Sequence, residues 1–342
     1  MSLLSIWTGS WDFVTGCFRV HRSRDACGDD AESPKVQQYF EGFTDLPIEL
    51  QEHVVKSCYS ARDQFNMSLI DIRCHYLIRR CRIRPETITL KVIDDEPQIL
   101  MTFEHQKHKK CTWVVKSTRK IGGKEREQGK KEIIEGIQFI FWNDFHNMNT
   151  ISCFTLEPMN SVKVLMDYLT KLFPRNQQYE EVVLNTDVMK KTPEEFLKQL
   201  PTKKTKTLSI KGKDMKTDQI VVLTKGFQCD FFLHLEDGFS GDPNLLKSIN
   251  VRFARFDSGS CISSYHLSNL NSEFIVALQT KFKTSDLVKL VNDWIESDNS
   301  ELKGVFLFHT EVTYSRHQVI HETGAEAWKE EDREKCFLFE NR

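Results

Sequence analysis

The chain has 342 residues, of which 39% are hydrophobic and 28% are charged, with 47 basic and 49 acidic side chains. This apolar fraction supports a folded core and excludes disorder over the whole length. The longest apolar runs fall far short of the ~20 residues that a membrane-spanning helix needs. A net charge of −2 provides no global field for nucleic acid or acidic lipid.

The cysteines and the first residues bear on the compartment. Ten cysteines are scattered along the chain without a C-x-x-C motif, whereas a disulfide scaffold would be smaller and denser. The amino-terminal stretch lacks the basic region that opens a signal peptide. We therefore expect reduced thiols and a location in the cytoplasm, the nucleus or both.

The first 82 residues divide into a tail and a helical module. Residues 1–42 have no sustained hydrophobic period and predict a poorly ordered tail. Residues 43–82 have helical spacing: Leu46-Pro47 opens a first helix, in which Leu50 and Val54 lie one turn apart. Two more short helices follow. A module of about 40 residues is small for independent folding, so we expect it to pack against the next domain or a partner.

Residues 83–150 change to the alternation of β-strands. Apolar residues alternate in Thr87–Val92, and strand-like runs follow at hairpin distances, so we predict an antiparallel β section. Between Lys107 and Lys131 there are ten basic residues and two glutamates. We interpret Lys116–Lys131 as a long exposed loop. Attraction of nucleic acid or an acidic partner is the alternative, although few aromatic residues accompany the lysines.

Residues 151–310 alternate helix and strand, and we assign residues 151–342 to one α/β repeat domain. An amphipathic helix spans Val162–Phe173, and a capping box at Thr192 begins the next helix. A later apolar stripe places Trp294 in the core. Strands centred near positions 183, 208, 233, 252, 276 and 306 recur about every 20–30 residues, which is typical of an irregular leucine-rich-repeat-like α/β solenoid. A doubly wound α/β domain is the competing topology.

The chain lacks the sequence signatures of common catalytic and metal sites. It contains no G-x-S-x-G, no G-x-G-x-x-G and no paired Cys/His zinc spacing. His317 and His321 lie one helical turn apart, but Gln318 stands where a zinc protease has its catalytic glutamate. We therefore expect no catalytic residue, metal or cofactor. A hydrolase hidden in an α/β domain remains the weaker alternative.

The repeated strands also predict a binding surface. In each strand, the residue between two inward apolar residues points away from the core. If the strands are parallel and in register, these residues form one exposed row: Val183, Ser209, His234, Arg252, Ala277 and Phe306. A row that combines cationic and aromatic side chains suits a protein or peptide better than a small cofactor.

Several segments, taken in order, resemble a known family. Phe43–Leu50, followed by Asn66–Leu69 and a basic third helix, resembles an F-box. The strands after residue 86 and the segment Phe282–Ile295 are similar to the type 2 F-box-associated domain of nematode F-box proteins. The resemblance covers about residues 43–310. It departs from the pattern in the long tail, in polar residues of the second box helix and in the basic tract.

The resemblance implies a substrate-recognition subunit of an SCF-type (cullin–RING) ubiquitin ligase without chemistry of its own. The box, residues 43–82, would bind a Skp-family adaptor and through it a cullin, and residues 151–342 would bind a target protein. The implied adaptor face is Leu46, Pro47, Leu50, Val54, Ser68 and Leu69. The alternative is a stand-alone scaffold or a nucleic-acid-associated protein with a degenerate box. Binding of nucleic acid or a membrane is not expected.

Overall fold

A computed structural model describes residues 43, 45–58, 60–93, 96–103, 110–143, 147, 149–174, 178–189, 192–200, 203–296, 302–309 and 315–324. The predicted tail at 1–42 and residues 107–109 of the basic tract lie outside the described residues. The chain forms two compact units, with the boundary between Ile83 and Arg84. Residue 150, where we expected a further boundary, does not separate compact units.

The first unit contains helices α3 (Ile48–Cys58), α4 (Ala61–Ser68) and α5 (Ile72–Arg80). Polar caps fix where the later two begin. Ser60 and Asp63 form a capping box at the start of α4, and the Asp71 side chain accepts a hydrogen bond from the Arg73 backbone N–H at 3.0 Å. The helices bury a small core: Val54, Val55, Ala61, Phe65, Met67, Cys74, Leu77, Ile78 and Cys81.

The second unit begins with a mostly antiparallel section of its sheet. The strands are β1 (Thr87–Val92), β2 (Gln98–Thr102), β3 (Lys110–Ser117), β4 (Lys130–Ile134), β5 (Ile137–Asn143) and β6 (Thr150–Thr155). They lie in the order β1-β2-β3-β6-β5-β4, and the β3–β6 pair is parallel, which the alternation did not predict. The predicted loop at Lys116–Lys131 is wrong: η1 (Thr118–Lys120), α6 (Gly123–Gln128) and the start of β4 occupy it.

The same sheet continues through parallel strands in chain order. From β1 outward, the strands lie in the order β7 (Tyr179–Asn185), β8 (Thr205–Lys211), β10 (Phe232–Leu235), β12 (Phe253–Phe256), β13 (Phe274–Thr280) and β14 (Gly304–His309). Every neighbouring pair in this series is parallel. A separate pair joins β9 (Met215–Lys216) to β11 (Phe239–Ser240). The described residues thus form a mixed α+β fold on one large mixed sheet.

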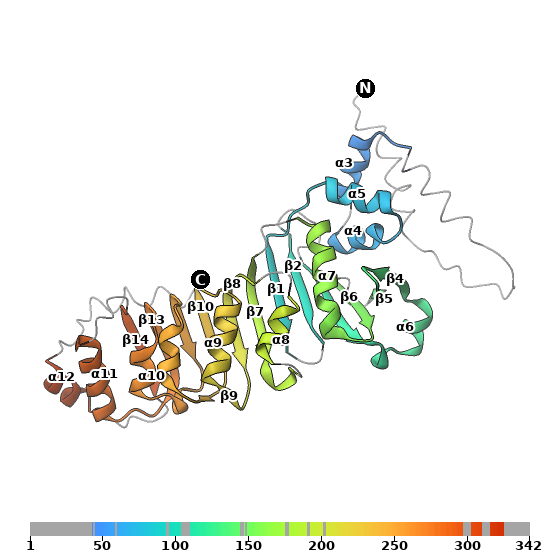
Figure 1. The fold of residues 1–342 in the computed structure, drawn as a ribbon. Helices are drawn as coiled ribbons and strands as arrows, with labels where there is room; N and C mark the ends of the chain where they lie inside the picture. Colours follow the sequence, from blue (N-terminus) through green and yellow to red (C-terminus); the bar gives the residue numbers. More distant parts are fainter. Residues whose placement is uncertain are drawn as a thin grey trace. The chain divides into compact units, whose positions relative to one another are not determined.

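Helices follow the strands one by one. They are α7 (Pro158–Leu172), η2 (Thr186–Val188), α8 (Pro193–Lys198), α9 (Thr217–Gly226), η3 (Pro243–Ser248), η4 (Gly259–Cys261), α10 (Ser264–Asn269), α11 (Thr284–Glu296) and α12 (Arg316–Thr323). Figure 1 shows α8, α9, α10 and α11 on one side of the parallel strands. Alternate strand residues are buried, for example Val182 and Leu184 in β7. Apolar burial therefore holds one face of the sheet against the helices.

The sequence pattern predicted some helices better than others. Helix α7 buries Val162, Leu165 and Leu169, and the Thr192 capping box at α8 is present, as expected. In α11 the prediction for Trp294 is wrong, because its side chain is 39% exposed and only Leu290 of that stripe is buried. A helical stripe shows which residues share a face, but not how deeply neighbours cover that face.

Candidate binding surfaces

The first unit leaves apolar side chains exposed at the start of α3. Leu46 is 36% exposed and Leu50 is 39% exposed, and Pro47 between them is also exposed. These three residues, which we call the α3 entry patch, belong to the implied adaptor face. Monomeric proteins usually cover large contiguous apolar surface. The patch is therefore a candidate docking surface.

The remaining residues of the implied adaptor face are less accessible. Val54 is 3% exposed and packs in the helical core, and Ser68 is 5% exposed. The Ser68 hydroxyl donates a hydrogen bond to the Phe65 carbonyl at 2.6 Å. Leu69 is half-buried. Val54 and Ser68 thus stabilise the unit and do not line its surface, which corrects the expectation for both.

Helix α5 exposes two apolar residues one helical turn apart. Ile72 is 62% exposed and Tyr76, one turn later, is 60% exposed. Cys74, Leu77 and Ile78 fill the core instead. The spacing of the exposed pair was visible in the sequence. The short helix, however, carries apolar residues around much of its circumference, so spacing could not decide which of them faces inward.

The second candidate surface is the face of the parallel strands opposite the helices, called the open face here. The strand register places seven residues in one row across it: Lys91, Val183, Ser209, His234, Arg255, Val276 and Phe306. All of them are half-buried except Ser209, which is 4% exposed. The row spans β1 to β14 without interruption.

The predicted row agrees with this register at four positions and fails at two. Val183, Ser209, His234 and Phe306 share the row. Arg252 lies outside the row, because β12 starts at the next residue, Phe253. Arg255 is the residue of β12 that pairs with His234. Ala277 is fully buried on the helix side, and Val276 takes its place in the row. Ser209 lies in the row but is buried, whereas we expected its side chain to be exposed.

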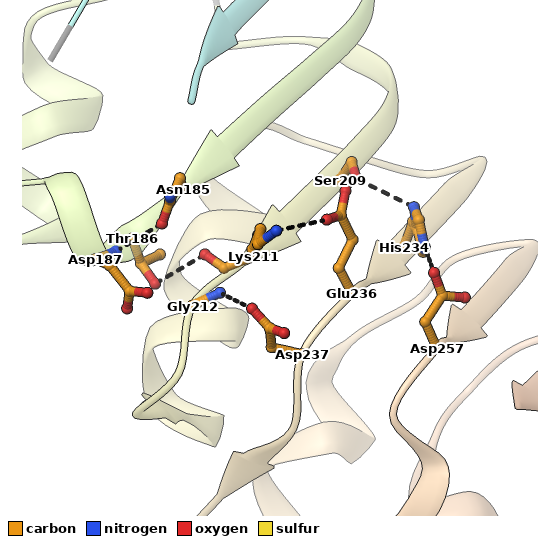
Figure 2. A network of polar contacts seen from close by, with 10 residues as sticks. All are labelled: Asn185, Thr186, Asp187, Ser209, Lys211, Gly212, His234, Glu236, Asp237 and Asp257. Atoms are coloured by element: carbon orange, nitrogen blue, oxygen red, sulfur yellow. Dashed lines mark hydrogen bonds and ion pairs between the residues drawn. The ribbon is translucent and has the colours of Figure 1, made fainter. Parts of the chain in front are cut away.

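A hydrogen-bonded chain crosses the middle of the open face (Figure 2). His234 Nε2 lies 2.9 Å from Asp257 Oδ2, and His234 Nδ1 lies 3.1 Å from Ser209 Oγ. A carboxylate only accepts, so His234 Nε2 donates to Asp257. The Ser209 hydroxyl also lies 3.4 Å from Glu236 Oε1, to which it can donate. Arg255 Nε donates to Asp257 Oδ1 at 2.7 Å. The four side chains come from three adjacent strands and the residue after β12.

More polar contacts follow at the carboxyl ends of β7, β8 and β10. Lys211 Nζ lies 3.8 Å from a Glu236 carboxylate oxygen, and the Gly212 N–H donates to Asp237 at 3.1 Å. The Thr186 hydroxyl donates to the Lys211 carbonyl at 3.1 Å. These contacts thus combine one ion pair between side chains with hydrogen bonds to the backbone, and they link the ends of neighbouring strands.

The electrostatics of Asp257 reflect these partners. Burial alone would raise its pKa, but hydrogen bonds from Arg255 and His234 outweigh it, so the pKa lies below its ordinary value. The carboxylate is thus ionised near neutral pH. It serves as an anchor for two cross-strand contacts.

The Ser209–His234–Asp257 chain has the residue types of a hydrolytic triad, but its surroundings do not suit catalysis. Ser209 is buried within β8, and this strand pairs with β7 on one side and β10 on the other. Those ladders use the backbone N–H groups that an oxyanion hole would require. Arg255 also competes for the carboxylate that would orient the histidine. The arrangement is better explained as a polar brace between strands.

Beside the polar chain, the open face becomes aromatic. Phe232, Phe253 and Phe274 occupy one register row on adjacent strands. The rings of Phe253 and Phe274 stack, with centroids 5.2 Å apart and planes 13° apart. Val276 and Phe306 continue the surface in the next row, and these residues are half-buried. We call Phe253, Phe274, Val276 and Phe306 the aromatic patch.

Arg252, which the strand register excludes from the observed row, borders this patch. Its guanidinium carbon lies 5.4 Å from the Phe253 ring centroid and 6.0 Å from that of Phe231. It also pairs with Glu273 at 3.5 Å, and Lys303 pairs with the same carboxylate at 2.8 Å. No sequence pattern pointed to this cluster, because it joins residues that precede three different strands.

Comparisons with known proteins identify no relative. No family model matches the chain, and neither a curated protein nor a solved structure is significantly similar to it. Across the described ranges, no three His, Cys, Asp or Glu side chains are grouped as a metal site would require, and His317 and His321 are exposed. No helix in the same ranges has the length and apolar character needed to cross a membrane.

Proposed function

We propose that the chain is the substrate-binding subunit of an SCF-type ubiquitin ligase. Its first unit would dock on a Skp-family adaptor and through it a cullin, and the open face of its second unit would bind the target protein. The observation that carries the proposal is the α3 entry patch. A small three-helix unit leaves Leu46, Pro47 and Leu50 exposed at the opening that resembles an F-box.

Physical reasoning supports docking through this patch. A unit of this size gains limited stability from its own core, yet it keeps apolar residues outside that core. Contact between exposed leucine side chains and water is unfavourable. Binding of a partner that removes these side chains from water is therefore favourable. Exposed Ile72 and Tyr76 on α5 offer further apolar area on the same unit.

The second unit supports the receptor half of the proposal. We interpret its parallel strands in chain order as an irregular leucine-rich-repeat-like solenoid, which offers an extended binding surface. The open face combines aromatic residues with a polar border, as protein interfaces do. In this proposal the chain contributes binding alone, ubiquitin transfer occurs on partner subunits, and the complex works in the cytoplasm or nucleus.

In the described part of the basic tract, two of the lysines are paired with glutamates. Lys120 pairs with Glu96 at 3.1 Å, and Lys130 pairs with Glu132 at 3.0 Å. Lysines engaged in this way are less available to phosphate groups. No observation favours a second function strongly enough to propose it.

The experiment is complex formation between the full chain and a recombinant Skp-family adaptor, measured by size-exclusion chromatography with light scattering. Leu50→Asp should abolish the complex, because it places a charge in the α3 entry patch. Ile133→Asp is the matched control, because Ile133 in β4 is 72% exposed on the second unit. We expect a 1:1 complex for wild type and the control. A wild-type chain that forms no complex would contradict the proposal.

A further inference from the structure

We propose that the aromatic patch binds an unphosphorylated segment of the target protein through an aromatic or aliphatic side chain of that segment. This inference rests on the proposed function, and it names the class of target. It follows from the packing of the patch and from the pairing of the charges around it.

The patch is a continuous apolar surface on three neighbouring strands. Phe253 stacks on Phe274, and the register places Val276 opposite Phe306. Gly304 allows the two parts to meet. A Cβ atom at this position would lie 3.3 Å from the Phe274 ring and 3.4 Å from the Phe306 ring, which is closer than Cβ atoms usually approach other atoms. Glycine thus lets the two rings converge into one surface.

Each cation that adjoins the patch is paired with a carboxylate, and Arg252 and Lys303 share the same one. Arg255 is held by Asp257 at 2.7 Å, Arg252 by Glu273 at 3.5 Å and Lys303 by Glu273 at 2.8 Å. Recognition of a phosphate relies on arginine or lysine groups that can turn toward it. Here a phosphate would have to compete with Asp257 for Arg255 and with the shared Glu273 for Arg252 and Lys303. An apolar side chain meets no such competition at the apolar surface of the patch itself.

The form of the surface favours a protein segment. Anchors at protein interfaces are aromatic or arginine residues in an apolar centre, with polar groups around it that exclude water. The aromatic patch supplies the centre. The Ser209–His234–Asp257 chain on one side and the Arg252–Glu273–Lys303 cluster on another supply the polar border.

The test is selection of random 12-residue peptides displayed on phage against the full wild-type chain. Enriched peptides would be synthesised with and without phosphoserine, and their affinities measured by fluorescence anisotropy. The comparison uses Phe306→Ala in the patch and Tyr265→Ala, an aromatic residue of α10 that is 41% exposed on the helix side. Circular dichroism would verify that both variants fold.

We expect enriched peptides to share aromatic or aliphatic residues and to bind at least about fivefold more weakly to Phe306→Ala, but equally to Tyr265→Ala. A failure to enrich peptides, binding unaffected by Phe306→Ala, or a preference for the phosphorylated forms would overturn the inference. So would a wild-type dimer that Phe306→Ala dissociates, since a second copy would then occupy the patch. Adaptor binding by Phe306→Ala reports separately on the proposed function.

Discussion

Substitution of both leucines of the α3 entry patch should weaken adaptor binding by an amount that their exposure sets. Complete burial of a leucine side chain contributes about 1.5–3 kcal/mol. Leu46 and Leu50 are 36% and 39% exposed, so a partner can bury only this remaining part. The Leu46→Ala/Leu50→Ala chain should therefore lose about 1–2.3 kcal/mol, or roughly 5- to 50-fold in affinity.

Isothermal titration calorimetry of the full chain with a Skp-family adaptor measures this loss. Val54→Ala is the control, because Val54 is 3% exposed within the helical core. We expect it to lower the free energy of unfolding by about 1–3 kcal/mol while the folded chain keeps its affinity. Wild-type affinity in the double variant, or a loss confined to Val54→Ala, would refute docking through the α3 entry patch.

Three further predictions concern the second unit. Trp113→Ala should cost about 3–5 kcal/mol of stability in urea unfolding, because Trp113 is fully buried, and Trp294→Ala should cost less than half as much; equal losses would contradict the exposure of Trp294. Gly259→Ala should destabilise by about 1–3 kcal/mol, since the new methyl group would lie 2.3 Å from a backbone carbonyl of β13, whereas Gly123→Ala, with open space around it, should be neutral or stabilising; a harmless Gly259→Ala would refute this close contact. The pKa of Asp257 is lowered, so the stability that its carboxylate contributes is complete above the ordinary pKa of 3.8 and is lost as the pH falls through the lowered pKa. The melting temperature of Asp257→Asn should therefore fall less than that of wild type as the pH drops through this range. Identical acid profiles of the two chains would contradict the assignment.

The elements that sequence alone predicted well have strong local signals. The apolar stripe of α7 and the Thr192 capping box each depend on residues within one or two helical turns. Alternation in β7, β8 and β10 identified the outward residues Val183, Ser209 and His234, and the parallel register that we assumed for them is present. These patterns are fixed by local geometry, so the sequence contains them directly.

The errors in the row have a common physical cause. In β13 the run Phe274–Leu278 is apolar at every position, so alternation could not tell which residues face the helices. Before β12, Val251 is buried without belonging to the strand, and the small Ala254 takes the inward position. The predicted inward residues therefore lay three positions before the observed ones, and Arg252 was predicted in the place that Arg255 occupies.

Contacts between distant residues were beyond sequence reasoning. Asp257 and Glu236 follow their strands, and only the register brings them beside His234 and Lys211. The exposure of Trp294 likewise depends on how the last helices pack. Such features arise from tertiary arrangement, for which a single sequence offers no periodic signal.

Hydrogen exchange of the full chain, with and without a saturating Skp-family adaptor, tests the central claim most directly. The two-surface account predicts that adaptor slows exchange in α3 and around the Leu46–Leu50 opening. Strands β10–β14, which carry the open face, should exchange at an unchanged rate and stay available to a target. Unchanged exchange throughout α3 under saturation, or protection centred on β10–β14, would contradict the account.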